Sequence, residues 1–346
     1  MARRFGLRSG LVGILFSLAC ISILWRQVSL RQSWQALSAL SAPLLLLPLI
    51  VLILNLPLRA WRWHLIFPRP SRPGFWSCLT VLGVGNMANF LLPGRAGDVS
   101  RCVLIGPTGT WHEGSRALAT LALEKILDGL ALIAMLLLST RNFPLPLWVF
   151  KLVDAATIVF LLALAFLLFA HYRSHRVVDF ARTGSRLLHF PALELRIERL
   201  VASFAEGVAA VASPVQMLLL LALTAAIWIT EIILVWGLAN ALHLTISLSA
   251  SAMATAVLGL GLMIPAAPGG LGTYELFGTE VFKVAGLAAA RGLTLTVVIH
   301  AWVFVTNIAL GLLLLAAQGV SLAQLKRRVD GIAPDSTEIP PNRSSA

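Results

Sequence analysis

The sequence predicts an all-α integral membrane protein, built as a polytopic helix bundle. Apolar residues make up 58% of the 346 residues, charged residues only 12%, and the mean hydropathy is +0.86. Spans must be helices, because backbone groups in lipid have to pair within their own segment, and the alternating pattern of a membrane barrel is missing. A helix needs roughly 20 residues to cross about 30 Å of hydrocarbon. We therefore expect residues 1–320 to form about six full spans and two interrupted elements, which is about eight apolar segments by hydropathy.

We attribute the net charge of +12 to arginines in cytoplasmic loops rather than to a nucleic-acid binding surface. Arginines cluster in the loops, as the positive-inside rule predicts for cytoplasmic loops, and such loops face anionic lipid headgroups. The cysteines, Cys20, Cys78 and Cys102, lie in or beside apolar segments. Their spacing fits neither a metal site nor a disulfide framework.

The chain begins with arginines ahead of an apolar run at 11–25, a form that a signal peptide also has. No convincing cleavage site follows, so we expect an uncleaved first span with a cytoplasmic N-terminus. A second span is expected at 43–58, where Pro48 and Pro57 should kink or end the helix. The arginines that come next predict a cytoplasmic loop: Arg59, Arg62, Arg69 and Arg72.

An apolar run at 75–92 follows, interrupted by Gly83, Gly85, Asn86 and Asn89. Full spans are expected at 117–138 and 147–170. The longest polar stretch, 170–214, is rich in arginine, which places it in the cytoplasm. The helical spacing of its apolar residues predicts two amphipathic helices at the inner interface.

The second half of the chain repeats this alternation. Its apolar segments are expected at 215–240, 248–267, 271–290 and 293–317. Basic residues at 326–328 place the end of the last span in the cytoplasm. The proline-bearing tail at 321–346 should be disordered and cytoplasmic.

The pattern Pro-Gly-x-x-Gly occurs at 93–97 and again at 268–272, each time after an apolar run. If the positive loops are cytoplasmic, the element that contains the first copy must enter and leave the membrane on the cytoplasmic side. The element that contains the second copy must enter and leave on the outer side. Each element is then a re-entrant hairpin or a pair of tight spans. One broken element from each face is the inverted-repeat plan of many transporters, in which the breaks mark the binding site. The residues expected to shape the breaks are Asn89, Pro93, Gly94, Gly97, Pro268, Gly269, Gly270 and Gly272.

Ionisable residues inside spans are functional candidates, because each costs about 2.5–3.5 kcal/mol at the centre of a helix on insertion scales. Glu124 and Asp128 lie on one face of a span, and two carboxylates there should attract cations. The candidate partners are Lys125, Arg95 and Arg101. This cluster either binds substrate or forms a buried ion-pair network that fixes the interrupted element to the span.

Further acids lie in the second half of the chain. Glu231 stands in the middle of a span, where it either faces a cavity or pairs with a donor such as Trp228. Glu275 directly follows the second glycine motif, where it either closes the start of a helix or faces the cavity. Glu280 and Lys283 are three residues apart and should pair with each other.

Motifs of enzymes are missing from the sequence. It contains no P-loop, no zinc-binding His-Glu-x-x-His and no nucleophile elbow. It also contains no polar domain large enough for a catalytic fold. We therefore expect no catalytic residue, no cofactor and no metal.

Three stretches, at 89–101, 124–128 and 268–275, resemble the transmembrane flippase domain of lysylphosphatidylglycerol synthetases and its stand-alone relatives. The family pattern is similar to Asn-x-x-Leu-Pro-x-Arg-x-Gly-Glu-x-x-Arg, then Glu-Arg-x-x-Asp, then Pro-Gly-Gly-x-Gly-x-x-Glu. This chain has Asp98 where Glu is usual and Lys125 where Arg is usual. The resemblance covers roughly residues 10–320 and implies a lipid-translocating protein of a bacterial inner membrane. We expect a stand-alone member without the aminoacyltransferase domain, and such relatives include proteins associated with hopanoid biosynthesis.

The sequence therefore favours a flippase-like transporter of a lipid with a polar headgroup. Arginine forks would attract a phosphate, and the acids would balance them or bind a cationic headgroup or a proton. The predicted substrate-binding residues are Arg95, Asp98, Arg101, Glu124, Lys125, Asp128, Glu231 and Glu275. The alternatives are a non-catalytic scaffold that binds lipid-biosynthesis enzymes through its basic stretch, and a membrane enzyme that modifies a lipid.

Cysteine labelling tests whether the two motifs open to opposite faces of the membrane. In a cysteine-free background, Ala96→Cys should react with an impermeant maleimide from the cytoplasmic side and Leu271→Cys from the opposite side. Labelling of inverted and right-side-out vesicles measures this. Reaction of both cysteines from the same side would contradict the inverted repeat.

Overall fold

The computed structural model describes residues 41–68, 72–92, 96–105, 111–139, 147–173, 213–263 and 268–317, together with the isolated positions 35, 38, 143, 176 and 179. The expected first span at 11–25, nearly all of the polar stretch at 170–214 and the tail at 321–346 lie outside the described residues.

The described part of the chain is helical and contains no strand. Two of its elements, η1 and η5, are short 3-10 helices, and the others are α-helices. The elements are η1 (Ala42–Leu45), α3 (Leu46–Ile66), α4 (Phe75–Leu91), α5 (Ala96–Leu104), α6 (Trp111–Ser139), α7 (Leu147–Tyr172), α10 (Pro214–Ala241), α11 (Leu248–Met263), η5 (Pro268–Gly270), α12 (Thr273–Val284) and α13 (Ala289–Ala317).

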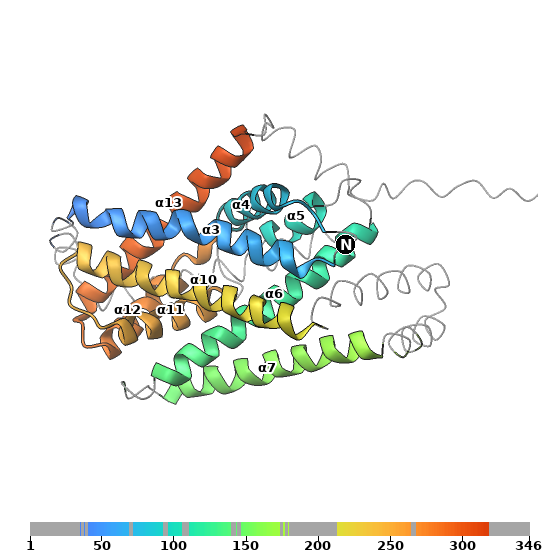
Figure 1. The fold of residues 1–346 in the computed structure, drawn as a ribbon. Coiled ribbons are helices and arrows are strands. Elements are labelled where there is room, and N and C mark those ends of the chain that lie inside the picture. The colour runs from blue at the N-terminus through green and yellow to red at the C-terminus, as the bar shows by residue number, and fades with distance from the viewer. Residues whose placement is uncertain are drawn as a thin grey trace, which may run out of the picture.

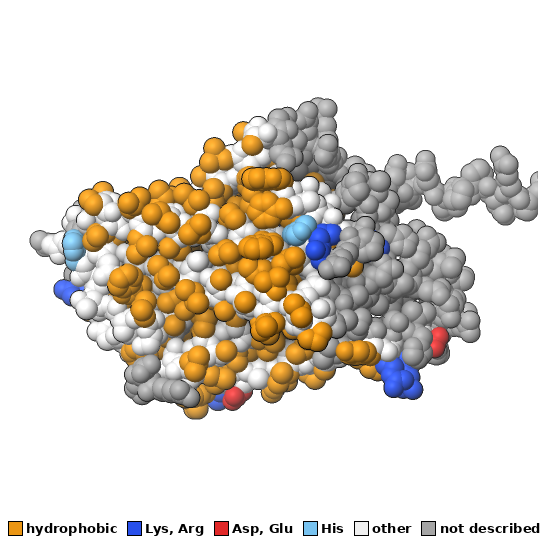
Figure 2. All heavy atoms as spheres, in the orientation of Figure 1, with side chains coloured by type: hydrophobic (Ala, Val, Ile, Leu, Met, Phe, Trp, Pro, Cys, Tyr) orange, Lys and Arg blue, Asp and Glu red, His pale blue; other side chains and the backbone are white. Residues whose placement is uncertain are grey.

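Long apolar helices confirm the predicted class, a polytopic helical membrane protein. Among the described residues, Ala42–Ile66, Pro214–Ala241 and Ala289–Ala317 are long and apolar enough to cross a membrane. Shorter apolar helices cover Phe75–Leu91, Val153–Phe166 and Leu248–Leu262. Figure 2 shows hydrophobic side chains spread over the visible face, with charged side chains at its margins. This is the surface that lipid tails require.

Helix α3 is longer than the sequence predicted. The expected span ended at residue 58, but the helix continues to Ile66 with Pro57 inside it. The prediction that Arg59 and Arg62 belong to a cytoplasmic loop was therefore wrong. Both arginines stay within the helix because carboxylates of other helices pair with them.

The first interrupted element is a helical hairpin made of α4 and α5. Helix α5 has nine residues, or about 13 Å at 1.5 Å per residue, which is too short to cross the hydrocarbon. This favours the hairpin over a second span. The Asn89 side chain joins the two helices, because its Oδ1 accepts from Asp98 N and its Nδ2 donates to Asp98 Oδ1, both at 3.1 Å.

The second interrupted element consists of α11, η5 and α12. Its glycines have positive φ angles, 67° at Gly269, 76° at Gly270 and 85° at Gly272. Side chains other than that of glycine rarely adopt this region, so the second motif needs these glycines for its backbone path.

The helices pack in corresponding pairs (Figure 1). Helix α3 lies along α10, α4 packs on α13 as α11 packs on α6, and α5 packs on α6 as α12 packs on α13. Helix α7 lies on the outside, against α6. The first interrupted element, α4 and α5, is thereby packed against α13 and α6. The second, α11 and α12, is packed against α6 and α13.

Gly97 allows α5 to lie close to α4, and a larger residue there should destabilise the protein. A Cβ at Gly97 would lie 2.6 Å from Asn89 Oδ1 and still closer to the carbonyl oxygen of Gly85. Overpacking of this kind costs about 1–3 kcal/mol, so Gly97→Ala should lower the thermal unfolding midpoint in detergent.

Gly114→Ala is the matched control, because its Cβ would meet only the Cys102 carbonyl oxygen, at 3.7 Å. This variant should unfold at or above the temperature of the unmodified protein. Equal midpoints for the two variants would contradict the close packing at Gly97.

Candidate functional site

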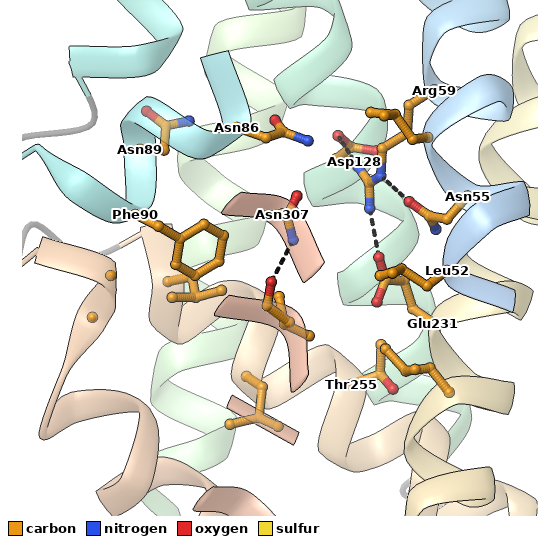
Figure 3. Close-up of a pocket in the computed structure, with 18 of the residues that line it drawn as sticks. Leu52, Asn55, Arg59, Asn86, Asn89, Phe90, Asp128, Glu231, Thr255 and Asn307 are labelled. Carbon is orange, nitrogen blue, oxygen red and sulfur yellow. Dashed lines mark hydrogen bonds and ion pairs between the residues drawn. The ribbon is translucent and has the colours of Figure 1, made fainter. Parts of the chain in front are cut away.

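A cavity of about 330 Å³ lies between the two interrupted elements. Its lining comes from α3, α4, α5, α6, α10, α11, η5, α12 and α13. Leucine, isoleucine and valine side chains form much of the wall, and polar side chains converge on the rest (Figure 3). The ends of both breaks reach it, through Asn89 on one side and Gly269 and Gly270 on the other.

Most of the predicted substrate-binding residues line this cavity. They are Arg101, Glu124, Lys125, Asp128 and Glu231. Asp98 contacts the lining through Asn89, Arg101 and Lys125. Arg95 lies outside the described residues, as do Pro93 and Gly94 of the same motif.

Eight charged side chains form one alternating chain of ion pairs beside and within the cavity. The nitrogen–oxygen distances are Lys125–Asp98 3.4 Å, Asp98–Arg101 3.6 Å, Arg101–Glu124 2.7 Å, Glu124–Arg62 4.0 Å, Arg62–Asp128 2.7 Å, Asp128–Arg59 4.0 Å and Arg59–Glu231 3.0 Å. The chain joins α5, α6, α3 and α10. The predicted alternative, a buried network that fixes the interrupted element to its neighbouring span, is therefore present.

The centre of this ion-pair chain is buried and has fork geometry. Arg101 donates through both terminal nitrogens to Glu124, at 2.7 and 3.3 Å. Arg62 does the same to Asp128, at 2.7 and 3.0 Å. The Arg101 guanidinium also lies over the Trp63 ring, 4.3 Å from its centroid. Such paired forks are strong and directional, so these four side chains hold the frame of the site.

Glu231 lies at the partly exposed end of the ion-pair chain. Its side chain is 26% exposed, against 0–6% for Arg62, Arg101, Glu124 and Asp128. Arg59 donates to its Oε1 at 3.0 Å, while the Trp228 indole donates to Asp128 instead. Glu231 thus both lines the cavity and pairs with a donor, and that donor is Arg59 instead of Trp228.

Sequence reasoning missed the part of the site that α3 contributes. Arg59 and Arg62 supply half of the cations in the ion-pair chain, and Asn55 accepts from Arg59 Nε at 2.7 Å. The signal was present, because positions 55, 59 and 62 follow the i, i+4, i+7 spacing of one helix face. A polar stripe that continues an apolar run indicates an interior face rather than a loop.

Glu275 closes the start of α12 rather than lining the cavity. Its Oε2 accepts from Gly272 N at 2.6 Å. Its Oε1 lies 2.5 Å from His300 Nδ1, and His300 Nε2 lies 2.9 Å from the Gly269 carbonyl oxygen. Sequence reasoning did not assign His300 to the site. The predicted pair of Glu280 and Lys283 is confirmed at 3.0 Å.

The described residues contain no group of three or more His, Cys, Asp or Glu side chains that could hold a metal ion.

The family model described as the lysylphosphatidylglycerol synthase TM region matches residues 10–311. No curated protein and no solved structure matches the chain.

The buried fork between Arg101 and Glu124 predicts strong coupling between the two side chains. Arg101→Met or Glu124→Met alone leaves a buried charge without its main partner, and each should destabilise the protein by about 3–5 kcal/mol. The double variant should lose much less than the sum. Unfolding midpoints in detergent, compared in a double-mutant cycle, measure this.

The Glu280–Lys283 pair provides the control, because both side chains are partly exposed. Its coupling should stay within about 1 kcal/mol. Strictly additive losses at Arg101 and Glu124 would contradict the fork as a stabilising interaction.

Proposed function

The chain belongs to the lysylphosphatidylglycerol synthase transmembrane-region family, and we propose that it moves a lipid with a polar headgroup across a bacterial inner membrane. In this proposal the headgroup enters the cavity between the two interrupted elements, while the tails stay in the surrounding lipid. The lipid changes leaflet and keeps its chemical structure.

The composition of the cavity lining carries the proposal. About 330 Å³ is within the usual range of small-molecule sites, about 300–1,000 Å³. Apolar walls would accept the glycerol and proximal acyl carbons, and the polar side chains would replace water around the headgroup. Ionisable groups at membrane depth typically mark substrate and ion pathways.

The packing of the two halves supports alternating access. Helix α11 of the second half corresponds to α4 of the first, and α13 corresponds to α6. Interchanging the halves therefore turns the α4–α13 contact into the α11–α6 contact, and α3 packs on its own counterpart, α10. This is the pattern that an inverted repeat produces. The breaks also touch, because the Phe90 ring beside the first break packs on Phe304 at 5.6 Å and next to Gly269 of the second. Rocking of one half against the other would open the cavity to either face.

Exposure divides the charged residues into two roles. We assign Arg62, Arg101, Glu124 and Asp128 to the buried frame, since each is paired and almost fully covered. Headgroup contact falls to the partly exposed side chains, which are Lys125 at 31%, Glu231 at 26% and Arg59 at 19%. Lys125 would attract a phosphate. The Oε2 atom of Glu231, to which no described residue donates, would accept from a hydroxyl or an ammonium group.

A headgroup-accessibility assay tests the proposal. The full chain is reconstituted into phosphatidylethanolamine and phosphatidylglycerol vesicles that carry head-labelled forms of these lipids, and an impermeant quencher reports which leaflet they occupy. Glu231→Gln should slow translocation by roughly 10- to 100-fold, because it removes charge-assisted hydrogen bonds worth about 1.5–3 kcal/mol.

Glu280→Gln, whose carboxylate pairs with Lys283 away from the cavity lining, should translocate at the normal rate. Unchanged translocation in Glu231→Gln would contradict the site assignment. A labelled lipid recovered in chemically altered form would favour a lipid-modifying enzyme instead.

A further inference from the structure

His300 ties three elements together at the second interrupted element. It lies on α13, its Nδ1 contacts Glu275 Oε1 on α12 at 2.5 Å, and its Nε2 contacts the Gly269 carbonyl oxygen in η5 at 2.9 Å. The side chains are covered, with 6% of His300 and 15% of Glu275 exposed. These contacts are therefore largely shielded from water.

These contacts fix the number of protons on the pair. A carbonyl oxygen can only accept, so Nε2 must carry a hydrogen. A neutral imidazole then presents a lone pair at Nδ1, and a carboxylate presents another at Oε1. Two lone pairs repel each other, so this contact is a hydrogen bond only when a second proton lies between Nδ1 and Oε1. With both protons, the pair is neutral as a unit.

Loss of the shared proton would break the arrangement. The pair would then carry one net negative charge in a covered site at membrane depth, which is costly. Whichever nitrogen kept the remaining hydrogen, the other would face an oxygen lone pair. One contact must open, so either Gly269 or the start of α12 separates from α13.

We propose that His300 and Glu275 form a proton-binding site that holds the break between α11 and α12 closed. The ligand is one proton, shared between Nδ1 and Oε1. Gly269 lines the cavity and lies next to Phe90 of the first break, so the occupancy of the site controls part of the cavity wall. The inference concerns the cavity of the proposed lipid transporter but does not require that lipid is transported.

Few other titratable groups lie on the elements packed against the pair. Tyr274 is closest, with its ring 4.5 Å from the imidazole, and it lines the cavity together with Glu231 of α10. Helix α11 carries no titratable residue. The remaining groups on the neighbouring helices are Glu280 and Lys283 on α12, Arg291 on α13 and Cys78 on α4. Glu280 and Lys283 pair with each other, which makes Glu280 a suitable control.

The test uses a cysteine at Leu271, which is 50% exposed and follows the break directly. In a cysteine-free background, the rate of maleimide labelling of Leu271→Cys is divided by that of Leu248→Cys, a residue 56% exposed at the start of α11. The division removes the pH dependence of the thiol reaction. The ratio should rise several-fold as the pH is raised and the shared proton leaves.

Two variants should fix the break in opposite states. In Glu275→Gln, the amide donates to Nδ1 and its oxygen accepts from Gly272, so both contacts persist without the shared proton. Its ratio should stay low at every pH. In His300→Ala, the Gly269 carbonyl loses its donor, and the ratio should stay high. The control, Glu280→Gln, should keep the pH dependence of the unmodified chain.

A ratio that does not change with pH in the unmodified pair, or a Glu275→Gln variant that follows the normal pH curve, would overturn the proton site. The readout needs no lipid movement, so it is independent of the vesicle assay. A pH-dependent ratio without translocation would remove the transport proposal and keep the proton site, and translocation with a constant ratio would do the reverse.

Discussion

A charge held at membrane depth must have its partner beside it, and this constraint organises the protein. Eight charged side chains from four helices meet it by pairing in alternating order, with forks at Arg62–Asp128 and Arg101–Glu124. Removing one side chain of either fork would leave a buried charge without its main partner. The long α3 helix, the folded-back α5 helix and the cavity between them all depend on this mutual compensation.

Composition and periodicity predicted the helices and breaks well, because apolar runs and Pro-Gly pairs are local signals. The acids of the site were found for the same reason, since a carboxylate inside an apolar run stands out. Arg101 was correctly named as a candidate partner of these acids, but Arg59 and Arg62 were missed, because pairing is a tertiary property. Arg59 and Arg62 follow a proline at the end of an apolar run, and only carboxylates far away in the sequence keep them helical. His300 was undervalued because its partners lie more than 20 residues away.

The two copies of Pro-Gly-x-x-Gly look equivalent in sequence, but they are stabilised differently. In the first, the Asn89 side chain replaces missing backbone contacts at the start of α5, and Gly97 provides room for close packing. In the second, glycines supply left-handed backbone, and Glu275 with His300 closes the start of α12. A symmetric plan of helices therefore carries two chemically distinct joints: an amide and a carboxylate, Asn89 and Asp98, connect the first, and a carboxylate and an imidazole, Glu275 and His300, connect the second.

The alternating order of the ion-pair chain has an electrical consequence. Four cations and four anions sum to zero, so the described cluster moves no net charge when its helices shift together. Moving one elementary charge through 100 mV is worth about 2.3 kcal/mol. The membrane voltage does no such work on this neutral cluster. Voltage acts instead on whatever net charge a bound molecule or proton brings into the cavity.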